Sequence, residues 1–318
     1  MHLPVISKFN RKKSGLPPYF RKNYIHSYLM LLIPMIGFLL FSAYPIIWMV
    51  KHSFYTYDGV SWRFEGILEN YITILSNPIF LKSILNTFIF FGKLLVEIPL
   101  AFILALLLNR ALPGRNFIRG AIFLPNVTSI AVMAVVFYVL LQPFSGFINQ
   151  FMINIGILAQ PVDWLGSRWM ALGSCMLISI WKNLGLNMLL ILAGLQTIPT
   201  DFYEAGELEG ITFWQKIRMI IIPYLRPYLQ VIVMLGMIGT LKVADLIIVL
   251  TNGGPGTETE VMMSFVYHRF FGRGGGNTGV LNLGEAAAGA VIAGSIIAIV
   301  TLIYLYINRR SSDTSNIY

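Results

Sequence analysis

The sequence predicts an all-α membrane protein with about six transmembrane helices, and three observations lead to this fold class. Of the 318 residues, 56% are hydrophobic and only 12% are charged, against roughly 25% charged residues in typical soluble domains. The chain contains six apolar stretches, each near the roughly 20 residues that a helix needs to cross a bilayer core. Its Lys and Arg residues are concentrated in alternate loops, as expected for a multi-pass protein.

The chain begins with a basic tail at residues 1–26. It carries Lys8, Arg11, Lys12, Lys13, Arg21 and Lys22. We interpret this tail as a cytoplasmic retention signal rather than a nucleic-acid-binding arm. The apolar segment Ser27–Val50 that follows is longer than the roughly 7–15 residues of a signal-peptide core, and no small-residue cleavage site follows it. It is therefore expected to stay as an anchor, kinked at Pro34 and Pro45.

Five further spans are predicted after this anchor. They are approximately Phe80–Leu108, Gly120–Leu141, Met170–Leu195, Pro227–Leu250 and Glu285–Ile307. Six spans place both termini, including the tail at 311–318, on one side of the membrane. The loops and tails on that side hold fourteen Lys and Arg residues and the opposite loops hold six, so the terminal side is predicted to be the cytoplasm.

The loops on the opposite side are rich in aromatic residues and glycine. The stretch Phe147–Leu158 is weakly amphipathic, so we expect it to lie flat at the membrane surface. The glycine-rich region 251–284 lacks the Gly-Lys-Ser/Thr ending of a phosphate-binding loop and is interpreted as turns. In the last span, Ala290 and Gly294 form a pair of small residues that favours close packing against another helix.

No metal site is predicted. The lone cysteine, Cys175, lies in an apolar run, and the four histidines are scattered near segment ends without a metal-ligand spacing. Cys175 is interpreted as a small buried packing residue.

The segment between the fourth and fifth spans is polar and acidic, and it predicts two short helices joined at a glycine. Thr200 can cap the first helix. Gly210 permits a backbone conformation that other residues resist. Thr212–Gln215 has the spacing of a capping box for the second helix, and Pro223 and Pro227 are expected to end that helix.

Ionisable residues also occur inside the predicted spans, where they are costly. Lys93 and Glu97 are four residues apart on one helix face, which favours mutual neutralisation. Lys182 lies in the polar run Trp181–Asn187 of the fourth span, and Lys242 and Asp245 lie in the fifth. These two clusters leave two interpretations open, helix packing or a solute pathway.

The run Gly194–Gly210, followed by Ile222-Pro223, resembles the EAA loop of binding-protein-dependent ABC importer permeases. Further landmarks resemble the carbohydrate-importing branch related to maltose permeases. They are Asn70-Tyr71, Asn86-Thr87, Trp164-Leu165, Thr251–Pro255 and Glu285–Ala287. The likeness runs from about Ser27 to Arg310.

This resemblance implies the fold of a type I importer permease, with a transmembrane domain at 27–310 and a coupling loop at about 199–226. In the family this loop docks on a cytoplasmic ATPase. The implied ATPase-coupling residues are Tyr203, Glu204, Ala205, Gly206, Glu209 and Gly210. The chain departs from the family pattern at Gly206 and Ile211, where Ala is usual, and at Glu209, where Asp is usual.

The resemblance also implies a substrate path along the fourth and fifth spans. With the polar positions noted above, its expected residues are Lys182, Asn183, Leu186, Asn187, Gly239, Thr240, Lys242 and Val243. They lack the aromatic residues and paired asparagines of the maltose pattern. The two lysines raise the hypothesis of an acidic sugar such as a uronate oligosaccharide.

The expected function is therefore that of a transmembrane subunit of a bacterial carbohydrate ABC importer in the inner membrane. The expected partners are a second homologous permease, two ATPase subunits that bind ATP and Mg, and an external solute-binding protein. This chain has no Walker motif, so we expect neither enzyme activity nor a cofactor in it. The alternatives are a similar permease for a non-sugar solute such as glycerol phosphate, or an ion-driven secondary transporter, which inverted repeats would support.

Overall fold

The computed structural model describes residues 18–57, 60–64, 66–272 and 282–313. The chain divides into two compact units, residues 1–51 and 52–318. Within the described residues, five helices are long and apolar enough to cross a membrane, and a bent helix pair supplies a sixth span. The prediction of a membrane protein with about six transmembrane helices is confirmed.

The first unit is a run of three consecutive helical segments: α1 (Pro18–Phe38), the π-helix η1 (Leu39–Ala43) and α2 (Tyr44–His52). Helix already begins at Pro18, inside the predicted tail at 1–26, whose boundary stays a prediction; residues 1–17 lie outside the described residues. Helical conformation continues past both Pro34 and Pro45. The wider π-turn just before Pro45 is one of the local adjustments by which membrane helices accommodate proline.

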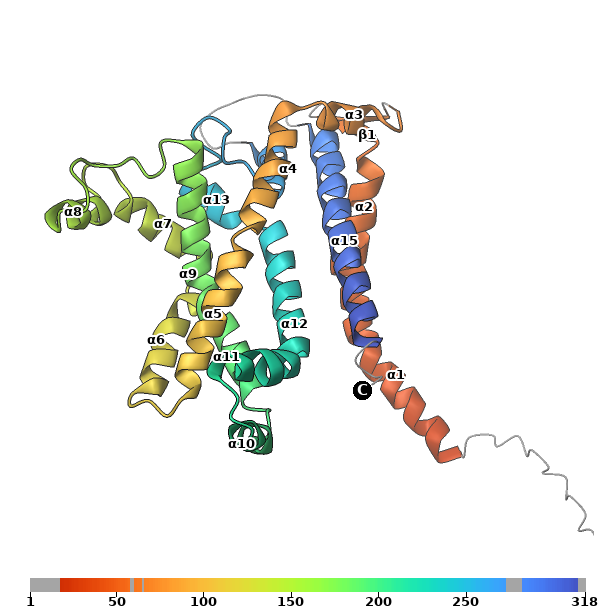
Figure 1. Cartoon of the computed structure of the whole chain (residues 1–318). Coiled ribbons are helices and arrows are strands. Elements are labelled where there is room, and N and C mark those ends of the chain that lie inside the picture. Colours follow the sequence, from red (N-terminus) through yellow and green to blue (C-terminus); the bar gives the residue numbers. More distant parts are fainter. Residues whose placement is uncertain (1–17, 58–59, 65, 273–281, 314–318) are drawn as a thin grey trace, which may run out of the picture. The chain divides into compact units, whose positions relative to one another are not determined.

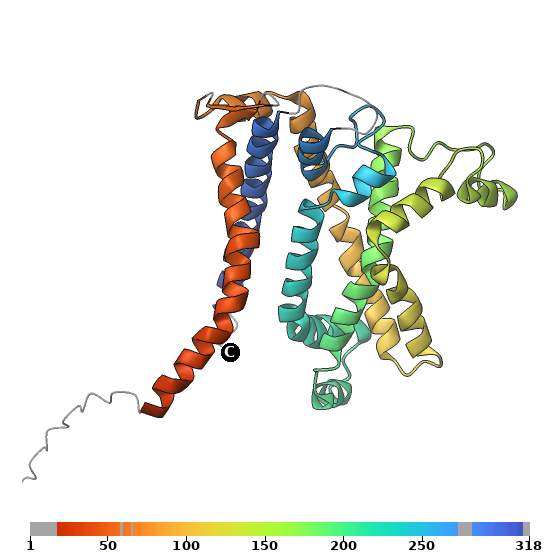
Figure 2. The ribbon, with the colours of Figure 1, turned by 180° about the vertical axis from the view of Figure 1, so that it is seen from behind.

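The second unit contains all the other elements, and Figures 1 and 2 show it from two sides. They are β1 (Tyr55–Tyr57), β2 (Trp62–Phe64), α3 (Glu69–Leu75), α4 (Pro78–Phe91), α5 (Leu94–Asn109), α6 (Arg115–Val127), α7 (Ile130–Leu140), α8 (Phe147–Asn154), α9 (Arg168–Leu195), α10 (Thr200–Leu208), α11 (Phe213–Lys216), the π-helix η2 (Ile217–Ile221), α12 (Ile222–Leu241), α13 (Asp245–Leu250), α14 (Met262–Phe271) and α15 (Leu283–Asp313).

Two predicted spans are not single helices. The third is bent by 97° between α6 and α7, where the run Asn126–Ser129 consists of weak helix formers. The fifth ends at Leu241, and α13 is a separate helix that packs against α7. Lys242 and Asp245 therefore lie at a helix break rather than on one helix, because tertiary packing redirects the chain after Leu241.

The polar segment forms the predicted helix–turn–helix, with one error at its start. Thr200 is the first helical residue of α10, and no side chain caps that helix. Gly210 has φ +69°, so the predicted glycine bend is confirmed. The capping box is also present: the Thr212 amide donates to Gln215 Oε1 at 2.7 Å, and the Gln215 amide donates to Thr212 Oγ1 at 3.4 Å.

The prediction that prolines end the second short helix is wrong. α11, η2 and α12 form one continuous span from Phe213 to Leu241. Pro223 is the second residue of α12 and Pro227 lies farther along it, so both prolines are inside the continuous helix. The π-helix η2 ends two residues before Pro223, so the backbone adjusts locally and the helix continues.

The end of the second unit away from α10 contains structure that the sequence did not predict. β1 and β2 pair antiparallel, with Tyr55 opposite Phe64, so a small hairpin is added to the otherwise all-α fold. Gly284 is required beside this hairpin, since a Cβ there would lie 1.7 Å from the Tyr55 carbonyl oxygen. The Asn70 side chain donates to the carbonyl oxygens of Ser53 and Tyr55 at 2.9 and 3.1 Å. These contacts join the hairpin to α3 and to the start of α15.

A second set of hydrogen bonds at the same end holds the region 251–261. Asn86 on α4 donates to the backbone carbonyls of Glu258 and Glu260 at 2.7 and 2.8 Å. Arg168, at the start of α9, donates to Asn86 Oδ1 at 2.8 Å. The helix α14 lies in the stretch that the sequence predicted as turns, and residues 273–281 of that stretch lie outside the described residues.

The last span, predicted at Glu285–Ile307, lies within α15, whose membrane-compatible part is Leu283–Arg309. Ala286, Ala287 and Ala288 are buried where α15 packs against α3 and α14. A Cβ at Gly294 would meet no atom of the described chain within 4 Å. The close packing predicted at this glycine is therefore not made within the part of the chain that the structure describes.

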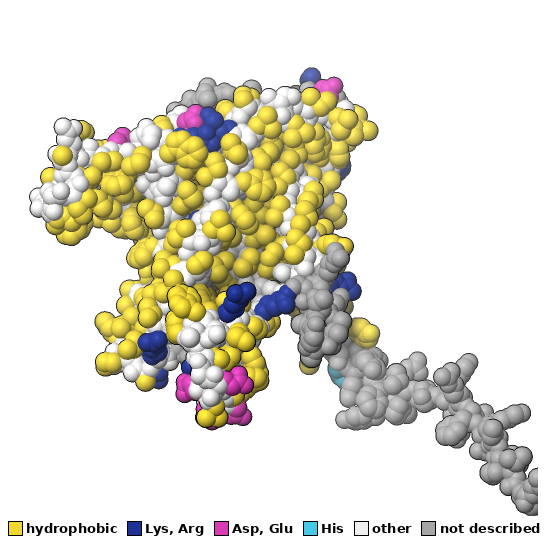
Figure 3. Space-filling view, viewed as in Figure 1, with side chains coloured by type: hydrophobic (Ala, Val, Ile, Leu, Met, Phe, Trp, Pro, Cys, Tyr) yellow, Lys and Arg dark blue, Asp and Glu magenta, His cyan; other side chains and the backbone are white. Residues whose placement is uncertain are grey.

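Hydrophobic side chains cover most of the described surface in the space-filling view, whereas Asp and Glu gather around α10 (Figure 3). In the second unit, α10 and the hairpin lie at opposite ends in both ribbon views (Figures 1 and 2). An apolar lateral surface between two polar ends suits a chain that spans a lipid bilayer.

Candidate functional site

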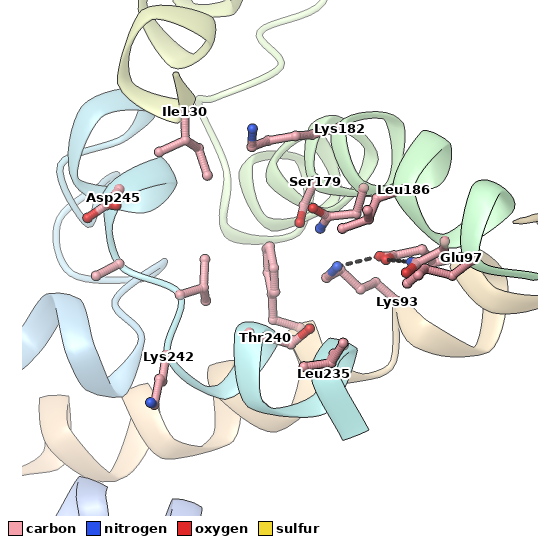
Figure 4. A pocket seen from close by; sticks show the side chains of 18 residues that line it. Lys93, Glu97, Ile130, Ser179, Lys182, Leu186, Leu235, Thr240, Lys242 and Asp245 are labelled. Atoms are coloured by element: carbon pink, nitrogen blue, oxygen red, sulfur yellow. Dashed lines mark hydrogen bonds and ion pairs between the residues drawn. The ribbon is translucent and has the colours of Figure 1, made fainter. Parts of the chain in front are cut away.

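A cavity of about 270 Å³ lies among α5, α9, α12 and α13 and collects polar side chains (Figure 4). All the residues predicted for the substrate path line it: Lys182, Asn183, Leu186, Asn187, Gly239, Thr240, Lys242 and Val243. The structure thus brings together the residues of both spans. Their role in transport stays a prediction.

One wall of the cavity holds a buried ion pair. Lys93 Nζ donates to Glu97 Oε2, and the two side chains are only 2% and 1% exposed. The predicted neutralisation between these residues is confirmed. The sequence did not indicate that Asn187 Nδ2 also donates to Glu97 Oε1, at 2.7 Å. This contact forms only because α5 packs against α9, and it gives Glu97 a partner on each oxygen.

Lys182 lies on another wall and is already engaged. Its ammonium donates to the backbone carbonyls of Asn126 and Thr128 at 3.2 and 2.8 Å. The sequence indicated a cation facing the path, and the structure adds that this cation bonds to the bend between α6 and α7. The sequence did not predict this contact, because its partners are more than fifty residues apart along the chain.

Lys242 and Asp245 line the cavity at the break between α12 and α13. Both are exposed, and neither side chain makes a hydrogen bond or ion pair within the residues that the structure describes. In Figure 4 the Lys242 side chain points away from the centre of the cavity. With Lys93 neutralised by Glu97, the charges that border the cavity are two lysines and one aspartate.

The predicted coupling residues lie on α10 and in the turn that follows it. Glu204 is exposed, and so are Ala205, Glu209 and Gly210. Lys216 lies over the Tyr203 ring, 5.6 Å from its centroid, and bonds Glu207 at 2.9 Å. Burial raises the pKa of Tyr203 above that of a free tyrosine, so its hydroxyl stays protonated. The helix therefore has an acidic exposed surface, and the contacts of Lys216 hold it against the helix that follows.

The departures from the family pattern at Gly206 and Ile211 compensate each other in the packing of this loop. Gly206 is the buried residue of α10, and a Cβ there would lie 2.6 Å from Ile211 Cδ1 and 3.2 Å from Ile220 Cδ1. The larger Ile211 thus fills the space that a methyl group at 206 would occupy. The loss of volume at one position compensates the gain at the other.

Potential metal ligands are dispersed. Within the described residues, no three His, Cys, Asp or Glu side chains are close enough to hold a metal ion. Cys175 is fully buried, as expected for a packing residue.

Comparison with known proteins shows to which family the chain belongs. Residues 97–313 match the family described as binding-protein-dependent transport system inner membrane component. A probable ABC transporter permease of Brucella suis is 30% identical over 286 residues, which cover 87% of this chain and 95% of the relative. The trehalose/maltose permease MalF of Thermococcus litoralis is 31% identical over 293 residues, 90% of this chain and 94% of MalF.

A solved structure supports the same assignment. It is a bacterial alginate ABC transporter in complex with an alginate pentasaccharide-bound periplasmic protein. One of its chains matches with a TM-score of 0.78 and 25% identity, covering 92% of this chain and 96% of that one. This chain is therefore a multi-pass membrane permease that belongs to the family of binding-protein-dependent transport system inner membrane components.

Proposed function

We propose that this chain is one of two transmembrane subunits of an importer that carries a sugar or oligosaccharide across a bacterial inner membrane. An external binding protein delivers the solute, and a separate pair of ATPase subunits binds ATP and Mg and drives the cycle. Both termini face the cytoplasm, which the distribution of fourteen against six cationic residues favours.

The cavity is the observation that carries this proposal. Its walls present the amides of Asn183 and Asn187 and the hydroxyls of Ser179 and Thr240. A sugar loses water on both donors and acceptors when it enters such a site, and only groups of this kind can replace that hydration.

The names of relatives favour a carbohydrate over glycerol phosphate or another non-sugar solute. They include a lactose permease of Rhizobium radiobacter and an arabinooligosaccharide permease of Bacillus subtilis, which are 30% and 29% identical to this chain. The architecture of the family also argues against an ion-driven secondary transporter.

The acidic surface of α10 is the proposed contact with the ATPase. Its exposed carboxylates, Glu204 among them, suit a partner cleft that contains arginine, and the bend at Gly210 sets the angle to the following helix. Closure of the ATPase pair would move α10, and the continuous helix Phe213–Leu241 leads from that loop to the cavity.

The charge of the sugar is a separate question, and Lys242 is the residue that bears on it. Unlike that of Lys182, its side chain is exposed and makes no hydrogen bond within the described residues, so its ammonium is free to attract a carboxylate. Neutral and uronate oligosaccharides should be compared in Lys242→Ala and Lys182→Ala strains. We expect loss of uronate preference in Lys242→Ala; unchanged preference in both strains would exclude an acidic sugar as the reason for these lysines.

The whole assembly tests the proposal. The chain should co-purify with a second permease and an ATPase pair, and the reconstituted complex should take up a labelled oligosaccharide only with ATP and the loaded binding protein. Lys51→Ala, an exposed lysine of the first unit, is the matched control and should transport normally. Uptake by this chain alone without ATP would refute the proposal.

A further inference from the structure

The predicted third span is broken between α6 and α7, and the backbone groups at this break need hydrogen-bond partners. Between α6 and α7 the chain bends by 97°, and Thr128 and Ser129 are extended. The last carbonyl groups of α6 therefore have no helical amide to bind. Unsatisfied backbone groups are costly where water is absent, so a broken membrane helix needs partners from elsewhere in the protein.

Lys182 supplies these partners from α9. Its ammonium donates to the carbonyls of Asn126 and Thr128, which lie on either side of the last residue of α6. A cation at the carboxyl end of a helix also interacts favourably with the helix dipole. Two of the three N–H donors of the ammonium are thus used by the bend.

A glycine on α9 brings this lysine within reach. A Cβ at Gly185 would lie 2.4 Å from the Ile122 carbonyl oxygen and 2.6 Å from Phe123 Cα, so α6 and α9 can cross this closely only with glycine here. Lys182 is one helical turn away from this crossing. On the far side of the bend, the rings of Phe137 and Trp181 are in edge contact with centroids 5.5 Å apart. α6 therefore meets α9 at Gly185 and α7 meets α9 at Trp181, so one arm of the bend contacts α9 on each side of Lys182.

The bend is also part of the cavity wall. Ile130, the first residue of α7, lines the cavity together with Lys182, and Figure 4 shows both on the same side of it. α7 in turn packs against α13, which carries Asp245. A change in the angle between α6 and α7 would therefore move one wall of the cavity.

We propose that Lys182 is a positioning residue, which holds the broken third span in its bent form and so sets the wall of the transport cavity. It acts through the backbone of Asn126 and Thr128 rather than by recognising the solute. The inference rests on the proposed function only in that the cavity serves transport; the bend and its hydrogen bonds to Lys182 do not depend on that function.

The test measures the bend directly in the complete importer without ligand or nucleotide. Spin labels are placed on cysteines at Phe117 and Tyr138, two exposed positions near the far ends of α6 and α7. The native Cys175 is buried and should not be labelled. With a rise of about 1.5 Å per residue, the two arms are about 16 and 15 Å long, so the label sites are about 21 Å apart when bent and about 31 Å apart if straight.

Three variants are compared in this background. Lys182→Met removes both donors, Lys182→Arg keeps charge and donors, and Lys242→Met is the matched control, a cavity lysine that does not touch the bend. We expect the distance distribution to widen toward the longer value in Lys182→Met only. The straighter form should gain roughly tenfold or more in population, as expected for loss of hydrogen bonds to a charged group.

Solute uptake then separates positioning from recognition. Lys182→Met should lower the maximal uptake rate more than it raises KM, and Lys182→Arg should restore the rate. A Lys182→Met distance distribution identical to that of the unsubstituted complex would overturn the inference, whatever the solute. If the methionine variant does not assemble, Lys182→Gln takes its place: it removes the charge and shortens the side chain, so the distance distribution should again widen relative to Lys182→Arg. If the distances widen in Lys182→Met but the unsubstituted complex takes up no carbohydrate, the proposed function is wrong and the role of Lys182 in the bend is retained.

Discussion

The buried cluster of Lys93, Glu97 and Asn187 provides the sharpest test of the energetics of this permease. Glu97 accepts hydrogen bonds from Lys93 on one carboxylate oxygen and from Asn187 on the other. The ion pair is almost completely buried. The perturbation is a double-mutant cycle with Lys93→Met, Glu97→Met and the two together, since methionine has a similar length and no charge.

The expected magnitudes follow from burial. Removing one partner of a buried ion pair leaves an uncompensated charge and typically costs about 3–5 kcal/mol, whereas replacing both partners by apolar residues is often nearly neutral. Each single variant should therefore lower the melting temperature of the assembled complex by on the order of 6–10 °C, at about 2 °C per kcal/mol for a chain of this size. The double variant should recover most of that loss. The coupling energy between the two sites should be about 3 kcal/mol or more.

The assay is thermal unfolding of the purified complex in one detergent, followed by intrinsic fluorescence, with uptake measured in parallel. The control is Lys51→Met, which removes an exposed lysine and should leave the melting temperature unchanged. Strictly additive losses in the double variant would refute the reasoning, because they would mean that the two charges do not stabilise each other. We also expect reduced uptake by the double variant despite its stability, since Asn187 loses the carboxylate that orients its amide beside the cavity.

Three further predictions concern the coupling loop and the opposite end of the unit. Glu204→Lys and Gly210→Pro should leave the chain assembled in the membrane but abolish ATP-dependent uptake; normal uptake in either variant would contradict the coupling role of α10. Gly206→Ala alone should destabilise the complex in a thermal melt by crowding Ile211, and the pair Gly206→Ala with Ile211→Ala should restore it. The hydrogen bond from Lys82, 2.5 Å long, lowers the pKa of Glu258, so its stabilising effect should be complete above the usual carboxyl pKa and disappear as the pH falls through the lowered one. Lys82→Met should remove this acid dependence from the melting temperature.

Several local features of the fold were predictable from the sequence. The apolar stretches identified all six spans, because the cost of placing a residue in hydrocarbon depends mainly on its own side chain. The capping box at Thr212–Gln215 and the bend at Gly210 were also predictable, since each depends on neighbours within a turn of chain. The same short-range reasoning failed at Pro223, where a preceding π-helix accommodates the proline and the helix continues.

The meeting of distant polar groups could not be predicted in this way. The sequence placed Lys182, Asn187 and Lys242 in two spans and left open whether they pack or line a path. Packing of α5 and α6 against α9 then decided that Asn187 bonds Glu97 and that Lys182 bonds the bend of the third span, while Lys242 stays free of such partners within the described residues.

The amino-acid sequence by itself determined that this chain is a multi-pass membrane protein with a polar helix–turn–helix between its fourth and fifth spans, because transfer energies and capping act over short stretches. Only the tertiary structure decided which charges are neutralised, which one bonds to the backbone of the broken span, and which one borders the cavity with no side-chain partner among the described residues. The physical reason is that a buried polar group must find its hydrogen-bond partners where the packed helices place them. In this chain those partners are 54, 56 and 90 residues away.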